Sequence, residues 1–242
     1  MVGMAALADR ILAHLQQVQQ LRALQDEDAA LARRVQALKQ YQQQRFERGY
    51  ADLLADPRYG AAARFFLNEL YGPSDYRARD AQFARVVPAL TRLFPREVAE
   101  TVLQLAELHA LTESLDQAMA LALPSGRISA HRYQQAWQQV GQQAQRLRQI
   151  DLTLDVGTAL QRYTGKPLLR QALRMMRAPA AAAGLSDLQQ FLERGFDTFR
   201  AMQDAQQFLA HIRQREQALA EALFAPASGA CPAGDDPLGQ LP

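Results

Sequence analysis

The stretch REVAETVLQLAELHALTESLDQAMALAL, residues 96–123, decides the fold class. Its large apolar side chains recur every three or four residues, at Val98, Val102, Leu105, Leu108, Leu111, Leu115 and Met119. This spacing gathers them along one side of an α-helix, whereas a half-buried strand would alternate apolar and polar residues. The stretch therefore predicts a long helix, which the turn-forming segment LPSGR at 123–127 ends.

The same periodicity runs through the rest of the chain, from residue 7 to 53 and again from 133 to 223. No alternating run bounded by turn residues interrupts it. The sequence thus predicts an all-α protein, an elongated antiparallel bundle of about six to eight helices with a long C-terminal helix. An antiparallel helical hairpin at about 4–56 is expected to precede a main bundle at about 57–225 within one domain.

Prolines and capping residues predict where individual helices begin, end or kink. Pro88 lies inside the helix expected between Pro73 and Pro95, where its ring should kink or split it. Ser129 can cap the next helix, which is expected to continue to Tyr163.

The last predicted helix, residues 187–224, has a geometric consequence. About 38 residues at roughly 1.5 Å each span about 57 Å, whereas a compact chain of this length has a radius of gyration of about 18 Å. Either the helix breaks, at Gly195 or around 203–207, or the domain is elongated.

The C-terminal segment PASGACPAGDDPLGQLP, residues 226–242, has the composition of a disordered tail. It carries Cys231, the single cysteine, so the chain cannot form an internal disulfide. A reducing cytoplasmic location fits this composition. Asp9 and Arg10 stand where a signal peptide would need apolar residues, and no run of about eighteen apolar residues predicts membrane insertion.

The charge is nearly balanced, with 27 basic and 25 acidic residues and a net charge of +2. This balance does not favour nucleic acid or an anionic membrane as the partner.

Sequence motifs for catalysis or cofactor binding are missing. The segment GTALQRYTGK, residues 157–166, resembles a phosphate-binding loop only superficially, because Leu160 replaces a required glycine and Pro167 a hydroxyl residue. No Glu-x-x-His repeat suggests a di-iron bundle, and the four histidines are isolated. We therefore expect no catalytic residue, no metal site and no cofactor.

The best polar constellation is ELHALTESLD, residues 107–116. His109, Glu113 and Asp116 are spaced i, i+4 and i+7 and so share one helical face. They could bind a cation or act as an acid and base, or they could form a solvated face.

A second candidate is the corner RFFLNELYGPSDYRARD, residues 64–80. Helix punctuation explains much of it: Gly72 can end one helix, and Ser74 or Asp75 can cap the next. Asp75 and Asp80 would then lie near the positive end of that helix, where acidic residues are stabilising. Punctuation does not explain why Tyr71, Tyr76, Arg77 and Arg79 gather at the same corner. They could form a hydrogen-bonded junction or a pocket for an anionic group, to which His109 and Glu113 could contribute.

The segments FFLNELYGPSDYRARDAQFARVVP, ELHALTESLD, RQIDLTLDVG and LQQFLERGFDTFRAMQDAQQFLAHI resemble a family of uncharacterised helical proteins from proteobacteria. The resemblance covers roughly residues 38–223. It implies a helical fold and no known activity, cofactor or catalytic residue.

These observations favour a binding or scaffolding module whose partner is another protein, rather than an enzyme. The alternative is a protein for a small ligand or metal, and possibly an enzyme, built around the 71–80 corner, His109 and Glu113. An exposed apolar patch would favour the first, and a pocket with convergent polar groups the second.

Overall fold

The computed structural model describes residues 3–69, 76–124, 126–202, 204–226 and 236–242. These residues form helices and no strand: α1 (Met4–Glu27), α2 (Ala29–Gly49), α3 (Ala51–Ala55), α4 (Gly60–Glu69), α5 (Arg77–Leu93), α6 (Arg96–Ala122), α7 (Ala130–Val140), α8 (Gln143–Thr164), α9 (Pro167–Met175), α10 (Arg177–Ala182), α11 (Ser186–Ala201), α12 (Ala205–Phe224) and the 3₁₀ helix η1 (Pro237–Gln240). Of the described helices, seven have sixteen or more residues, in agreement with the expected six to eight: α1, α2, α5, α6, α8, α11 and α12. The all-α prediction is confirmed.

Capping residues set several helix boundaries. Asp28 separates α1 from α2, because its Oδ1 accepts hydrogen bonds from the N–H groups of Ala30 (2.8 Å) and Leu31 (3.0 Å). Ser129 caps α7 as predicted, since its hydroxyl accepts from the N–H of Arg132.

Two expected continuous helices are broken. The helix expected from 129 to 163 ends at Gly141, whose φ of 64° is a left-handed value that suits glycine, and α8 starts after it. The expected C-terminal helix divides into α11 and α12. Asp204 begins α12 with a φ of 48° and accepts a hydrogen bond from the N–H of Gln207. The break therefore falls at the start of the predicted 203–207 region and not at Gly195. By contrast, α5 runs through Pro88 without being split.

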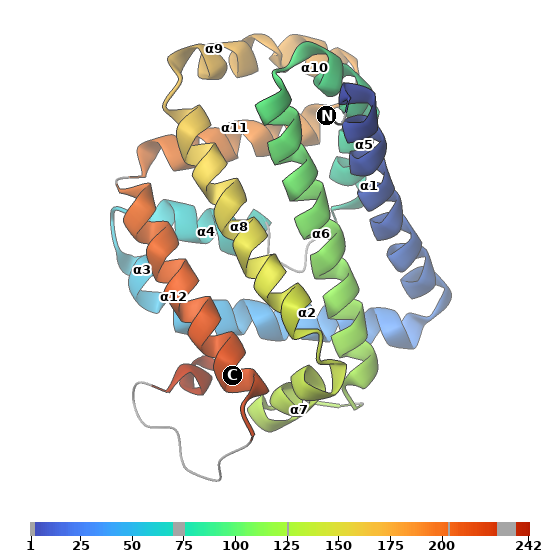
Figure 1. The fold of residues 1–242 in the computed structure, drawn as a ribbon, viewed down its shortest axis with the longest axis vertical. Helices are drawn as coiled ribbons and strands as arrows, with labels where there is room; N and C mark the ends of the chain where they lie inside the picture. The colour runs from blue at the N-terminus through green and yellow to red at the C-terminus, as the bar shows by residue number, and fades with distance from the viewer. Residues whose placement is uncertain (1–2, 70–75, 125, 203, 227–235) are drawn as a thin grey trace.

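Helix α6 lies at the centre, between α1 on one side and α8 on the other (Figure 1). The face of α6 that packs against α1 consists of Ala99, Leu103 and Ala106. Of the predicted stripe, Leu115 and Met119 are fully buried, whereas Val102, Leu105 and Leu108 are only partly buried. The alanines let α1 approach closely, so that Leu7, Ile11 and Leu15 pack with Ala99, Leu103 and Ala106.

The expected N-terminal hairpin is not formed as such. Helix α1 packs along α6 and α5, and α2 turns away from it to cross the bundle (Figure 1). The reason is that α5 and α6 cover the apolar face of α1, while α2 packs against α6, α7 and α12.

The end of the chain returns to the bundle. Residues 236–242 lie against α2 and α12, and Leu241 is buried in the same core as Leu38 and Tyr133. Arg48 Nη1 donates a hydrogen bond to the Leu241 carbonyl at 3.1 Å. A disordered tail is therefore the wrong expectation for residues 236–242, because the core covers Leu241. Residues 227–235 of the expected tail lie outside the described residues.

Candidate functional site: a buried polar network around α6

The predicted site residues do not all lie in the described part of the chain. Tyr71 and Asp75 fall outside it, and so do the expected caps Gly72 and Ser74. The structure brings the others into two neighbouring groups. Asp80, His109, Glu113 and Asp116 belong to a polar network between α1, α2, α5 and α6, and Tyr76, Arg77 and Arg79 surround the start of α5.

Asp80 joins three helices. Its Oδ2 lies 2.8 Å from Arg22 Nη1 on α1 and 2.8 Å from His109 Nε2 on α6. The side chain is buried. Burial acts to raise the pKa of Asp80, but the hydrogen bond and charge of His109, with the guanidinium groups of Arg22 and Arg79, outweigh it and hold the pKa below its usual value. Asp80 is therefore a carboxylate at neutral pH.

Glu113 continues the network one turn along α6. Its Oε1 accepts from Lys39 Nζ at 2.8 Å and lies 3.4 Å from Arg22 Nη2. The residue is only 4% exposed. Burial acts to raise the pKa of Glu113, but the charge and hydrogen bond of Lys39, with the charges of His109 and Arg22, lower it. Arg22 thus bridges Asp80 and Glu113, and the three side chains connect α1, α5 and α6.

Asp116, at the same end of the network, is in a different electrostatic setting. It is 3% exposed, and the Nε2 of Gln42 donates a hydrogen bond to its Oδ1 at 2.9 Å. Burial and the charge of Glu113 raise its pKa, although Lys39 and Gln42 act in the opposite direction. Two acidic residues three positions apart on α6 therefore have pKa values shifted in opposite directions.

The two arginines of the corner have different surroundings. Arg79 lies between the rings of Tyr76 and Phe191, 4.1 and 4.4 Å from their centroids, and donates to the Glu69 carbonyl. Burial lowers its pKa. Arg77 instead pairs with Asp26 through two hydrogen bonds of 2.7 and 2.8 Å at an exposed position. The Tyr76 hydroxyl donates to the Asn68 carbonyl at 2.9 Å.

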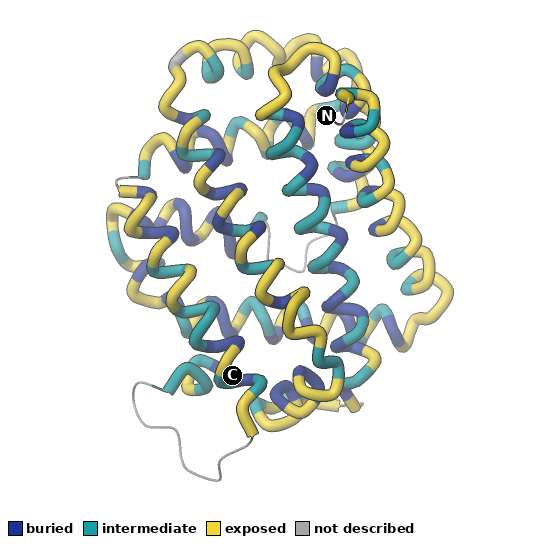
Figure 2. Tube along the Cα trace, in the orientation of Figure 1, coloured by how far each residue is buried: buried dark blue, intermediate teal, exposed yellow. Residues whose placement is uncertain are grey.

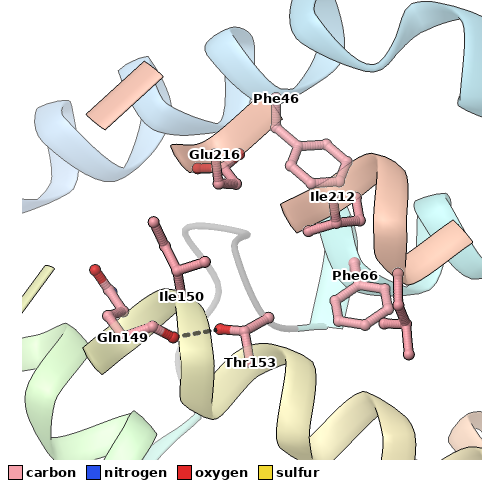
Figure 3. Close-up of a pocket in the computed structure, with 8 residues that line it drawn as sticks. Phe46, Phe66, Gln149, Ile150, Thr153, Ile212 and Glu216 are labelled. Carbon is pink, nitrogen blue, oxygen red and sulfur yellow. Dashed lines mark hydrogen bonds between the residues drawn. The ribbon is translucent and has the colours of Figure 1, made fainter. Parts of the chain in front are cut away.

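Two hollows lie elsewhere in the structure. A cavity of about 40 Å³ opens between α2, α4, α8 and α12, with an apolar wall and the Glu216 carboxylate at its edge (Figure 3). The Oε1 of Glu216 already accepts from Arg45 at 2.8 Å and from the Tyr50 hydroxyl at 2.7 Å. The cavity has room for only a few water molecules.

The second hollow is a shallow cleft of about 470 Å³ between α4 and α11. The Glu69 carboxylate lies 3.1 Å from Arg194 across it. Glu193 and Asp197 pair with Arg177 and Arg170 beyond its edge. The carboxylates of the cleft are therefore each paired with an arginine, and Arg64 on its wall donates to the Leu54 carbonyl at 2.9 Å.

Among the described residues, the most exposed large apolar side chain is Leu168. It belongs to α9, at one end of the molecule, where much of the trace is exposed (Figure 2). Leu168, Ala172, Met175 and Met176 share one side of this region, which we call the α9 face. Leu168 is 79% exposed and Met175 71%. No side chain described in α9 is buried.

Comparison with known families gives one result. The model of the family described as a domain of unknown function (DUF8198) matches residues 20–230. The chain belongs to this family. No curated protein and no solved structure matches the chain. The family match begins before residue 38, where the sequence resemblance started, and so includes Arg22 in addition to Lys39 and Gln42.

Sequence reasoning missed three members of the network: Arg22, Lys39 and Gln42. The sequence feature that could have identified them is a polar residue at a position where the helical spacing of the apolar residues predicts a buried side chain. Arg22 follows Leu15 and Val18 with helical spacing, Lys39 follows Val35, and Gln42 follows Leu38. Among the described residues, no group of three or more His, Cys, Asp or Glu side chains is arranged to hold a metal ion. None of the described helices combines the length and apolar character that a membrane-spanning segment requires.

Proposed function

We propose that the chain is a protein-binding module and that the α9 face is its binding surface. The observation that carries this proposal is the exposure of Leu168 and Met175 on a helix with no buried side chain described. Large apolar side chains that gather on one exposed helix face mark interaction sites more often than isolated ones do.

The α9 face is held on a firm support. Arg170 Nε pairs with Asp197 on α11 at 2.7 Å, and Gln189 of α11 donates a hydrogen bond to the Leu173 carbonyl. Leu169 and Leu173, on the inner side of α9, are partly buried. Because these contacts fix the helix, its outer side chains are presented in a defined geometry, which lowers the entropic cost of binding.

A second exposed apolar element lies at the same end of the molecule. Leu93, the last residue of α5, and Phe94, which follows it, are 74% and 45% exposed. The Tyr163 hydroxyl near the end of α8 donates to the Glu97 carbonyl in the first turn of α6, so this turn lies at the same end of the molecule as α9 (Figure 1).

The geometry of the polar network supports a structural role for it instead of the ligand-binding alternative. Asp80 and Glu113 are buried and already have cationic partners from other helices. Neither of the two hollows described above is lined by Asp80, His109 or Glu113. We infer that this network fixes α1, α2, α5 and α6 relative to one another.

A quantitative capture experiment tests the proposal. The wild type, the double variant Leu168→Ser/Met175→Ser and the control Leu24→Ser/Leu121→Ser are immobilised, and proteins retained from native extract are compared by mass spectrometry. Leu24 and Leu121 are also exposed but lie on α1 and α6. We expect the α9 variant to retain at least ten-fold less of those specific partners that the control still retains. Equal retention by all three would refute the α9 face as the binding surface.

A further inference from the structure

Residues 236–242, which we call the strap, lie across α2 and α12 at the other end of the molecule from α9 (Figure 1). Leu241 of the strap is 7% exposed and belongs to the core that includes Tyr41, and Leu238 packs against the same core. Within the strap only Gly239 is exposed. The strap is therefore seated on α2 and α12 as a short peptide ligand would be, and we call the surface that it covers the strap site.

Two arginines of α2 contact oxygen atoms of the strap. Arg45 Nη1 lies 3.4 Å from Gln240 Oε1, and Arg48 Nη1 donates a hydrogen bond to the Leu241 carbonyl at 3.1 Å. Arg45 is 5% exposed and also pairs with Glu216 at 2.8 Å. Arg48 is exposed, and the described contacts include no ion pair for it. The strap site thus combines a buried apolar position with hydrogen-bond donors, as sites for short peptides do.

The strap has a shape of its own. Asp236 Oδ1 accepts from the N–H of Leu238 at 2.8 Å, and Gln240 Nε2 donates to the Pro237 carbonyl at 2.9 Å. These local bonds support one turn of 3₁₀ helix. Gly49 of α2 permits the close approach of this turn, because a Cβ at that position would collide with Gln240 Oε1. A free segment of the same sequence can form the same turn, which lowers the entropic cost of its binding.

The strap and the strap site differ in their relation to the family. Helices α2 and α12 lie within the matched range 20–230, whereas the strap follows it. Residues 225–235, which connect α12 to the strap, include no aromatic residue and no Leu, Ile, Val or Met. The family model therefore contains the strap site but not the segment that occupies it in this chain.

We propose that the strap is an intramolecular competitor at a peptide-binding site. Its partner is a segment of another protein that has two leucines three residues apart and ends at the second leucine. The two leucines take the places of Leu238 and Leu241, and the terminal carboxylate faces Arg48. Hydrogen bonds to an ionised acceptor are roughly twice as strong as those to a neutral carbonyl such as that of Leu241. This inference is independent of the α9 face.

The covalent connection explains why the partner must make a contact that the strap lacks. A tethered segment competes at an effective concentration on the order of 1 mM. A free segment with the same contacts, at much lower concentration, does not displace it. A second copy of the chain is a poorer occupant for this reason, since its strap makes the same contacts and gains nothing by exchange.

Fluorescence polarisation of labelled peptides with the full chain tests the proposal. The probe is Asp-Pro-Leu-Gly-Gln-Leu with a free terminal carboxylate. Its controls are the same peptide ending in an amide and a peptide with serine in place of both leucines. The proteins are the wild type, Leu241→Ser, whose strap loses its buried side chain, and Leu24→Ser, which makes the same change at a half-exposed position of α1.

We expect Leu241→Ser to bind the carboxylate peptide about ten-fold more tightly than the wild type or Leu24→Ser does, because the competing strap is weakened. The amidated peptide should bind to Leu241→Ser about five-fold more weakly than the carboxylate peptide. Adding Arg48→Gln to Leu241→Ser should remove this difference, and the serine peptide should not bind.

Equal binding of the probe to the wild type and to Leu241→Ser would overturn the proposal. If Leu241→Ser loses its helical circular dichroism, Gln240→Ala decides instead, because it keeps Leu241 and removes only the contacts of the amide. Binding by Gln240→Ala no tighter than by the wild type would then refute a competing strap.

Two further outcomes would overturn the assigned partner. Equal binding of the carboxylate and amidated peptides would show that Arg48 does not select a chain end. A concentration-dependent dimer of the wild type in sedimentation velocity, absent in Leu241→Ser, would identify the strap of a second copy as the occupant.

Discussion

Two regions of the molecule depart from the rule that charged side chains are exposed and apolar ones buried. They are the polar network around α6 and, on another helix, the α9 face. The network buries Asp80, Glu113 and Asp116, although acidic residues are rarely buried without a partner. The α9 face exposes Leu168 and Met175, which interiors usually cover. The two regions differ in whether the chain itself supplies partners. Other residues of the chain supply the cations and hydrogen-bond donors that contact the buried carboxylates, whereas nothing described in this chain covers the α9 face.

This comparison separates stability from binding. Groups that are compensated inside the chain should affect folding strongly when one partner is removed, because the other stays buried and unpaired. Groups that face solvent should affect folding little and binding strongly. Five substitutions test this distinction.

The largest effect is expected for Glu113→Ala. This change leaves Lys39 and Arg22 without the carboxylate that they share, and breaking a buried ion pair in this way costs about 3–5 kcal/mol. Denaturant unfolding at neutral pH measures it. Glu107→Ala on the same helix is the matched control, because the Glu107–Arg148 pair is largely exposed on the arginine side and should contribute less than about 1 kcal/mol. Similar losses for both variants would mean that Glu113 is not part of a buried network.

A smaller, pH-dependent effect is expected for Asp80→Asn. At neutral pH it should lower the free energy of unfolding by about 1–3 kcal/mol, because Arg22 and His109 lose a charged acceptor. The pKa of Asp80 in the fold lies below its usual value of 3.8. Its stabilising contribution is therefore complete above that value and is lost as the pH falls through the folded pKa. Unfolding is measured at pH 7 and near pH 3, and the difference in the free energy of unfolding between wild type and variant should be smaller at the lower pH. A difference that does not change with pH would contradict the ion pair.

Asp116→Asn should change the free energy of unfolding in the opposite direction from Asp80→Asn. Because burial raises the pKa of Asp116, the unfolded chain loses this proton at a lower pH than the folded chain does. Wild-type stability should fall as the pH rises above the usual value of 3.8 toward the folded pKa. Asparagine can still accept from Gln42, so the variant should be at least as stable at pH 7, by up to about 1 kcal/mol. A clear loss at pH 7 would show that the carboxylate itself is needed.

The smallest effect on stability is expected for Leu168→Ser and Met175→Ser. Each should change the free energy of unfolding by less than about 0.5 kcal/mol, since each side chain is mostly exposed. Leu115→Ala is the control for a fully buried side chain of α6 and should cost about 2–5 kcal/mol. If the α9 variants unfold as easily as the control, α9 is a structural element and the comparison with the polar network fails.

The sequence by itself determined the helical fold and part of the site. The 3.6-residue periodicity, the cap at Ser129 and the shared face of His109, Glu113 and Asp116 depend on residues within one or two turns, so they can be seen in the sequence. The break beside Asp204 was also foreseeable, because a helix of that length exceeds the size of a compact domain.

The tertiary structure alone decided which faces and charges meet. Arg22 and Lys39 are 91 and 74 residues from Glu113, and no local pattern states that their helices cross there. Against α1, α6 buries Ala99, Leu103 and Ala106, whereas only Leu115 and Met119 of the predicted stripe are fully buried. Leu241 packs in a core to which the sequence did not assign it. Helix formation follows from neighbouring residues, whereas burial and the resulting pKa values depend on which distant surfaces fit together.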